Sequence, residues 1–210
     1  IVNTIPSKSV PSPVTPKTGD KIRLEEIVPG RFEETPKGKC FVYEERYSIY
    51  HYWGGIPFRR ILEEPYEELN SFIKEAIPRD FNPSKSVYLD TETTGLSGGT
   101  GTYVFLIGIG WIEGEHFIMR QFFMRDYDEE PAFLWLVREN LKKFDTIVTY
   151  NGKVYDIPLM ASRYTCNRYD EWYLPEFHID LLFPVRRLWK SRFKDCSLIS
   201  MERNVLQYYR

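Results

Sequence analysis

Cysteine is scarce in this chain, and long apolar runs are missing from it. Its 210 residues include 3 cysteines, Cys40, Cys166 and Cys196, which share no metal-ligand spacing. An odd number of scattered thiols argues against a disulfide scaffold and is typical of a reducing compartment, so we expect a cytoplasmic protein. No stretch approaches the roughly 18 apolar residues that cross a bilayer, and we therefore expect no membrane partner.

The start of the chain lacks two further signals. The opening Ile1-Val2-Asn3 has neither an initiator Met nor the charged-then-apolar pattern of a signal peptide. We therefore expect the sequence to be a processed or cut piece of a longer polypeptide.

An excess of one charge is also lacking, because the formal net charge is −2. This value does not by itself indicate a nucleic-acid-binding protein. The segment from Arg186 to Lys194 differs from the rest, since it holds five cations and no acid. Such a stripe can follow a phosphate backbone, but a solvated helix face has the same composition. Both interpretations stay open.

Hydrophobic residues make up 42% of the chain and aromatic residues 16%, which is enough for a core of its own. Residues 1–35 are rich in proline and charge, and we predict an extended or disordered arm. Residues 36–84 predict a small N-terminal β/α extension, with short antiparallel strands around Gly54 and a helix from Tyr66 to Ile77. Residues 85–210 predict the main domain.

The main domain shows an alternation of strand and helix patterns. Apolar runs begin near residues 87, 103 and 116, and a helical pattern then covers about residues 130–144. A buried strand at 146–150 and a helix at 157–164 follow. This order predicts an α/β fold with a mixed sheet flanked by helices, which is compatible with the ribonuclease H-like fold.

The first candidate site lies where the apolar run 87–89 ends in Asp90-Thr91-Glu92. Residues two apart on a strand share a face, so Asp90 and Glu92 point together while Thr91 points away. Two such carboxylates repel each other unless a cation neutralises them, and Mg²⁺ and Mn²⁺ prefer oxygen ligands. A solvated turn also fits this motif on its own.

The second candidate site is the segment 150–156, Tyr-Asn-Gly-Lys-Val-Tyr-Asp, which closes an apolar strand and opens a helix. Asp156 lies near the helix N-terminus, where a carboxylate is also a favourable cap. Asn151 and Gly152 likewise fit an ordinary turn. Each motif alone has an ordinary explanation, but the two together favour a shared site.

Both motifs match a known superfamily. The run from Asp90 to Leu96 resembles the first exonuclease motif of the DEDD superfamily, which includes polymerase proofreading exonucleases. Residues 151–156 resemble its second motif, in which Asn precedes an aromatic-Asp pair. Residues 101–108 and 178–182 are similar to the YprB-like branch of ribonuclease H-like domains, and the resemblance covers about residues 87–206.

The resemblance implies a metal-dependent nuclease that hydrolyses phosphodiester bonds, with 3′-to-5′ exonuclease activity. Asp90, Glu92 and Asp156 would be the catalytic residues and would hold two Mg²⁺ or Mn²⁺ ions about 4 Å apart. The partner would be DNA or RNA, most simply a single-stranded end. The residues implied beside the substrate strand are Thr93, Gly95, Leu96, Asn151 and Tyr155.

The chain departs from the superfamily pattern at its C-terminal side. A third motif, with a fourth carboxylate and a water-orienting His or Tyr, does not occur before Arg210. Asp180 matches an internal strand position rather than that motif, and His178 is expected to be a structural histidine. We therefore expect the missing motif in a longer polypeptide.

Two other functions compete with this one. A catalytically weak nucleic-acid-binding module with the same fold is favoured by the missing fourth carboxylate. A phosphotransferase or phosphatase with Asp90 as nucleophile would normally carry a second Asp two residues on, where this chain has Glu92. The choices between DNA and RNA, and between exonuclease and endonuclease, stay open.

Overall fold

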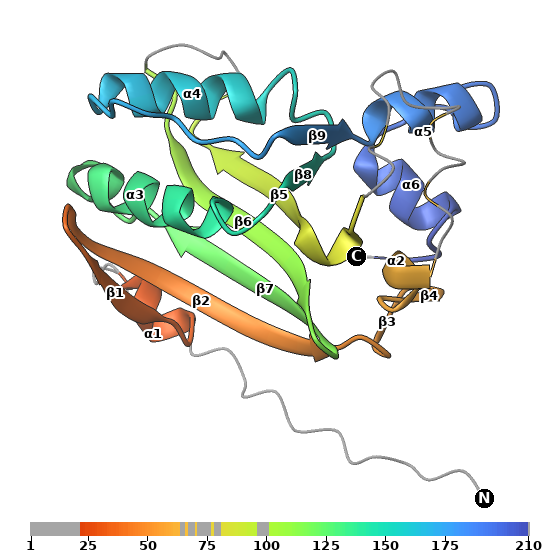
Figure 1. The fold of residues 1–210 in the computed structure, drawn as a ribbon, viewed down its shortest axis with the longest axis horizontal. Helices are drawn as coiled ribbons and strands as arrows, with labels where there is room; N and C mark the ends of the chain where they lie inside the picture. The colour runs from red at the N-terminus through yellow and green to blue at the C-terminus, as the bar shows by residue number, and fades with distance from the viewer. Residues whose placement is uncertain are drawn as a thin grey trace, which may run out of the picture.

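The computed structural model describes residues 22–63, 66, 70, 77, 81–95 and 101–209. Within them, seven strands form one sheet in the order β1-β2-β7-β6-β5-β8-β9 (Figure 1). These strands are β1 (Arg31–Thr35), β2 (Gly38–Ser48), β5 (Ser86–Thr93), β6 (Val104–Glu113), β7 (His116–Phe123), β8 (Thr146–Thr149) and β9 (Phe177–Asp180). The helices are α1 (Leu24–Ile27), α2 (Arg60–Glu63), α3 (Glu130–Leu141), α4 (Asp156–Cys166), α5 (Leu182–Trp189) and α6 (Leu198–Asn204).

The sheet is mixed, as the sequence predicts. Strand β5 pairs antiparallel with β6 and parallel with β8, and β8 pairs parallel with β9. The strands from β1 to β6 in the sheet order are antiparallel neighbours. Because β5, β8 and β9 run in the same direction, their carboxyl ends lie at one edge of the sheet.

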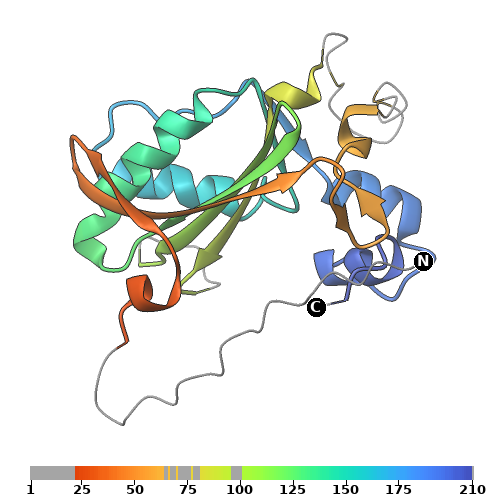
Figure 2. The ribbon, with the colours of Figure 1, turned by 90° about the horizontal axis from the view of Figure 1, so that it is seen from below.

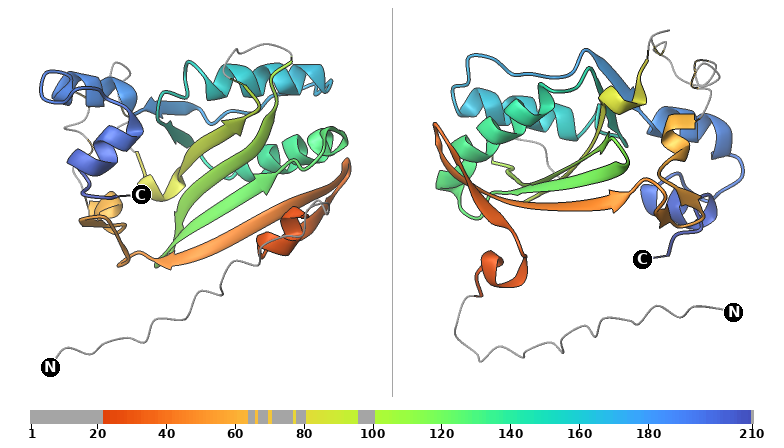
Figure 3. Two further views of the ribbon diagram at one scale, coloured as in Figure 1. Left: turned by 180° about the vertical axis from the view of Figure 1, so that it is seen from behind. Right: turned by 60° about the horizontal axis from the view of Figure 1, so that its bottom comes forward.

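The core lies between this sheet and two helices. Helices α3 and α4 cover the same face of the sheet, as the front and rear views show (Figure 1 and Figure 3). Six apolar residues of α3 are buried, and their spacing is the helical period of its sequence: Ala132, Phe133, Leu134, Leu136, Val137 and Leu141. The guanidinium of Arg163 on α4 donates to both carboxylate oxygens of Glu130 at 2.6 and 2.7 Å. This buried ion pair joins the two helices.

A small hairpin made of β3 (Tyr52–Trp53) and β4 (Ile56–Pro57) lies at the end of the molecule that holds α5 and α6 (Figure 2). The Gly55 N–H donates to the carbonyl of Leu206 at 2.8 Å, and the rings of Trp53 and Tyr208 are 5.5 Å apart. The hairpin and the C-terminal segment are therefore packed together.

The N-terminal part contributes two strands to the main sheet. Arg31–Thr35, expected to be the end of an extended or disordered arm, form β1 and pair with β2. Strand β2, in the expected N-terminal extension, pairs with β7 along eight positions. Its residues Cys40 and Val42 are fully buried in the core.

The structure leaves two further expectations for the N-terminal half open. The predicted helix from Tyr66 to Ile77 lies outside the described residues except for Tyr66, Asn70 and Ile77. A separate domain beginning at residue 85 stays a prediction. In the part of the chain that the structure describes, every helix is too short or too polar to cross a membrane.

Candidate active site

The first motif lies in the second half of β5, where the strand leaves the core. Leu89 is 4% exposed, whereas Asp90 and Glu92 are exposed. The alternation of a strand explains the change, since residues two apart share a face. The pairing of β5 with β6 shifts in register between Glu92 and Thr93. The two carboxylates thus reach solvent together at the carboxyl end of β5.

The second motif forms a tight turn between β8 and α4. Asn151 adopts a φ of 66°, in the left-handed region that few residues other than glycine, Asn and Asp accept. A Cβ on Gly152 would lie 2.6 Å from the Cβ of Thr149, so a larger residue cannot fit there without movement. Helix α4 then begins at Asp156, and the Ile157 N–H donates to the Gly152 carbonyl at 2.9 Å. The turn therefore fixes where Asp156 lies.

Asp180, at the end of β9, accepts hydrogen bonds from the main chain of this turn. Its Oδ1 accepts from the backbone N–H of Asn151 at 2.8 Å, and its Oδ2 accepts from the N–H of Lys153 at 3.1 Å. Oδ1 also accepts from the N–H of Leu182 at 3.0 Å. The side chain is 1% exposed, so a buried carboxylate here is satisfied by three amides. Asp180 is a positioning residue.

The two motifs meet through Thr91 and Asp156. The Thr91 hydroxyl donates a hydrogen bond to Oδ1 of Asp156, across 65 positions of the sequence. Thr91 does point away from the side of Asp90 and Glu92, as expected for a strand, but it points toward the second motif.

The surroundings of Asp156 disfavour its charged form. Burial raises the pKa of its carboxyl most, the Thr91 hydrogen bond lowers it, and repulsion from Asp90 raises it further, with a smaller contribution from Asp180. The net effect is a raised pKa. The carboxylate of Asp90 therefore acts on the pKa of Asp156, while Thr91, on the other side of β5, is the residue that contacts it.

The negative charge of the site would attract a cation, but the site lacks the full set of metal ligands. Among the residues that the structure describes, no group of three His, Cys, Asp or Glu side chains is placed to hold a metal ion. The expected set of three carboxylates is therefore not assembled. The mutual repulsion of Asp90 and Asp156 is the environment that a divalent cation stabilises. Both residues carry carboxylates, the donor type that such an ion prefers, and the described residues form no group of three that would include Glu92.

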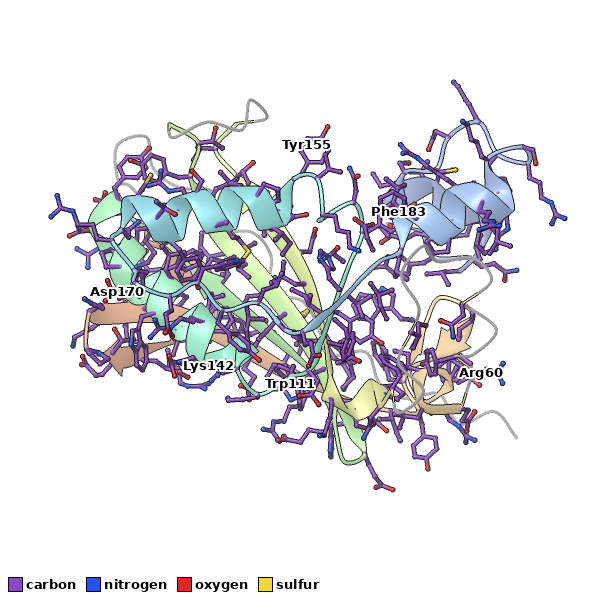
Figure 4. The ribbon with its side chains drawn as sticks, turned by 45° about the horizontal axis from the view of Figure 1, so that its top comes forward. Arg60, Trp111, Lys142, Tyr155, Asp170 and Phe183 are labelled. Atoms are coloured by element: carbon purple, nitrogen blue, oxygen red, sulfur yellow. The ribbon has the colours of Figure 1, made fainter. Side chains whose placement is uncertain are left out.

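Of the residues expected beside a substrate, Thr93, Gly95, Asn151 and Tyr155 are described by the structure. The Thr93 hydroxyl donates to the Gly95 carbonyl at 3.1 Å, and a Cβ at Gly95 would meet open space. Tyr155 is 60% exposed at the start of α4, where Figure 4 shows its ring directed outward. Leu96 lies outside the described residues.

His178 has a structural partner, as expected. Its Nε2 lies 2.9 Å from the Thr149 hydroxyl, on the neighbouring strand. The same Thr149 crowds Gly152. His178 therefore supports the turn that carries the second motif.

Sequence reasoning missed the roles of Thr91 and Asp180. The position of Thr91 between two acids is a weak signal, because it shows only that its side chain faces the other side of the strand. Asp180 follows an apolar strand directly, as Asp90 does, and that repeated pattern was the available signal for a carboxylate at the same edge.

Comparison with known proteins identifies the class. A family model of the RNase H superfamily matches residues 87–210, which is more than half of the chain. The chain belongs to this superfamily, whose members are commonly nucleases and typically use divalent metals.

A named relative supports the same assignment. YprB of Bacillus subtilis strain 168, described as an uncharacterized protein, is 33% identical over 171 residues. The match covers 80% of this chain and 41% of YprB, so the chain spans less than half of that relative. The resemblance to the YprB-like branch is thus confirmed.

A solved structure is also similar. A family B DNA polymerase from the archaeon Pyrobaculum calidifontis matches 71% of this chain and 21% of its own, with a TM-score of 0.36 and 16% identity. A likeness this weak supports no conclusion about activity.

Proposed function

We propose that this chain carries the active site of a metal-dependent nuclease that hydrolyses phosphodiester bonds, as a 3′-to-5′ exonuclease. The observation that supports it is the meeting of two distant motifs, in which Thr91 binds Asp156 and Asp90 repels it. Membership of the RNase H superfamily supports the same chemistry.

In this proposal Asp90, Glu92 and Asp156 bind two Mg²⁺ or Mn²⁺ ions. When bound, such ions activate water and stabilise the leaving oxygen. The exposed Tyr155 stacks on an unpaired base without reading its identity. Thr93, Gly95, Leu96 and Asn151 line the path of the strand.

Metal binding and hydrolysis test the proposal together. Titration calorimetry with Mn²⁺ is expected to show binding to the wild-type chain and loss of that binding in Asp90→Asn and Asp156→Asn. The same variants should cleave a labelled single-stranded oligonucleotide more than about 100-fold more slowly, since a direct ligand matters more than its outer partners. Asp170→Asn, at an exposed acid away from the site, is the control.

A second candidate is a nucleic-acid-binding module without useful catalysis. The missing group of three metal-holding side chains within the described residues favours it. Strand binding by a chain that neither takes up Mn²⁺ nor cleaves DNA or RNA would select this candidate over the enzyme.

A further inference from the structure

A basic groove of about 550 Å³ lies beside the turn of the second motif. One wall is α5, and the other is the segment 193–198 that follows it. The residues that shape it are Tyr150, Asn151, Arg186, Lys190, Phe193 and Lys194. Its volume is within the range of roughly 300–1,000 Å³ found for small-molecule sites, so it has room for a nucleotide.

The groove is positive although the chain as a whole has a net charge of −2. Arg186 and Lys190 are four residues apart at the end of α5, so they lie on one side of the helix, and Lys194 adds a third charge. Within the described part of the chain, none of these three forms a salt bridge.

Asp195 also lines the groove, but it is engaged in a turn. Its Oδ1 accepts from the Ser197 N–H at 2.9 Å and from the Ser197 hydroxyl at 2.6 Å. Three cations and one acid leave a net charge of two positives in the groove. An anion with spaced charges is the ligand that this arrangement suits.

The groove is physically continuous with the candidate active site. The Tyr150 hydroxyl donates to the carbonyl of Cys196, which ties the far wall to the turn. The next residue, Asn151, is held by Asp180 and begins the turn that ends at Asp156. A ligand in the groove therefore lies against the same turn that positions the carboxylate.

Aromatic side chains accompany the charges. Phe193 is half-buried in the groove, while Tyr155 and Phe183 are 60% and 43% exposed. Figure 4 shows Tyr155 at the end of α4 that faces α5, and Phe183 at the start of α5. Cations interleaved with aromatic rings are typical of surfaces that bind single strands, where bases stack and phosphates pair with cations.

We propose that this groove binds the sugar–phosphate backbone of a single nucleic-acid strand, with Arg186, Lys190 and Lys194 on successive phosphates and Phe193 against a base. The inference rests on the proposed function, which it deepens by assigning the basic segment to the substrate. It gives a role to three of the five cations at 186–194, the three that line the groove.

Strand binding is measured without catalysis, by fluorescence anisotropy of a fluorescein-labelled 12-nucleotide single strand in EDTA. The double variant Arg186→Gln/Lys190→Gln removes two groove charges. Its matched control, Arg187→Gln/Arg192→Gln, removes two exposed charges of the same segment that do not line the groove. The groove variant is expected to bind about 10-fold more weakly, and the control within about twofold of wild type.

The salt dependence gives a second readout. The slope of log K against log salt is negative, and each lost phosphate contact on a single strand reduces its magnitude by about 0.7. The magnitude should therefore fall by about 1.4 in the groove variant and by much less in the control. The single variant Arg186→Lys keeps the charge and should keep most of the wild-type affinity. Thermal melts by circular dichroism identify any variant whose loss comes from unfolding.

Three results would contradict the proposal that the groove binds a nucleic-acid strand. These are equal losses in both double variants, no binding by the wild-type chain at low salt, or displacement of the strand by polyglutamate at equal charge concentration. The last result would mark a surface for acidic proteins. Asp156→Asn should bind the strand normally in EDTA, so loss of hydrolysis with retained groove-dependent binding contradicts the proposed enzyme alone.

Discussion

The carboxylate of Asp180 holds the main chain of Asn151, 29 residues earlier, through a hydrogen bond of 2.8 Å from the Asn151 N–H. This bond forms because Thr149 and Asp180 are paired in the parallel register of β8 and β9. The turn that starts at Asn151 ends at Asp156, so the candidate active site depends on a buried side chain outside both motifs.

Removing the Asp180 carboxylate should destabilise the chain. Asp180→Ala leaves three backbone amides without an acceptor, and each buried unsatisfied group costs about 1–3 kcal/mol. We expect a loss of about 3 kcal/mol or more in the free energy of unfolding, measured by urea denaturation. Asp180→Asn keeps one acceptor oxygen and should lose less. Asp170→Ala, at an exposed position, should leave stability nearly unchanged; a similar loss there contradicts the anchor role.

A methyl group at Gly152 should distort the turn. The Cβ of Gly152→Ala would lie 2.6 Å from the side chain of Thr149, and overpacking of this kind costs about 1–3 kcal/mol. Gly95→Ala in the first motif meets open space and is the matched control. Thermal melting should separate the two variants. Equal melting temperatures would show that the turn can relax.

The raised pKa of Asp156 predicts an unusual pH dependence. A carboxyl whose folded pKa is above its unfolded value of about 3.9 favours folding when protonated, and this contribution is lost as the pH rises through the folded pKa. Asp156→Asn is therefore expected to be more stable than wild type at pH 7 in EDTA. The difference should shrink as the pH falls through the folded pKa and should be gone below about pH 3.9. A variant that is less stable than wild type at pH 7 contradicts the repulsion described for this site.

The three thiols should differ in reactivity. Cys40 is fully buried, and burial raises the pKa of its thiol to about 12, so little thiolate exists at pH 8. Cys166 is exposed and Cys196 is partly exposed. Brief labelling with iodoacetamide, followed by mass spectrometry, should modify Cys166 first and leave Cys40 intact until the chain is unfolded in urea. Early labelling of Cys40 would mean that the pairing of β2 in the sheet opens readily.

Much of the fold could be predicted because its strands and helices carry local periodicity. Helix α3 has apolar positions that match its buried face. Strand β1 could not be predicted in the same way, since it is an edge strand that pairs with β2 and has no buried residue. Strand β1 forms because β2 supplies its hydrogen-bond partners, and its own sequence lacks an apolar alternation that would predict it.

The acids of the candidate site could be identified one motif at a time, but their surroundings could not. Nothing local in the sequence shows that the Thr91 hydroxyl contacts Asp156, because that contact joins β5 to α4 across 65 positions. The same holds for the groove, where α5 meets the turn after β8.

The amino-acid sequence by itself determined the residue types that carry charge, the strands and helices with a clear period, and the two acidic motifs. Only the tertiary structure decided which of these groups meet, because the parallel pairing of β5, β8 and β9 brings Asp90, Asp156 and Asp180 to one edge of the sheet. It also decided that the acids differ in surroundings, since hydrogen bonds from three amides satisfy Asp180 while burial and repulsion raise the pKa of Asp156.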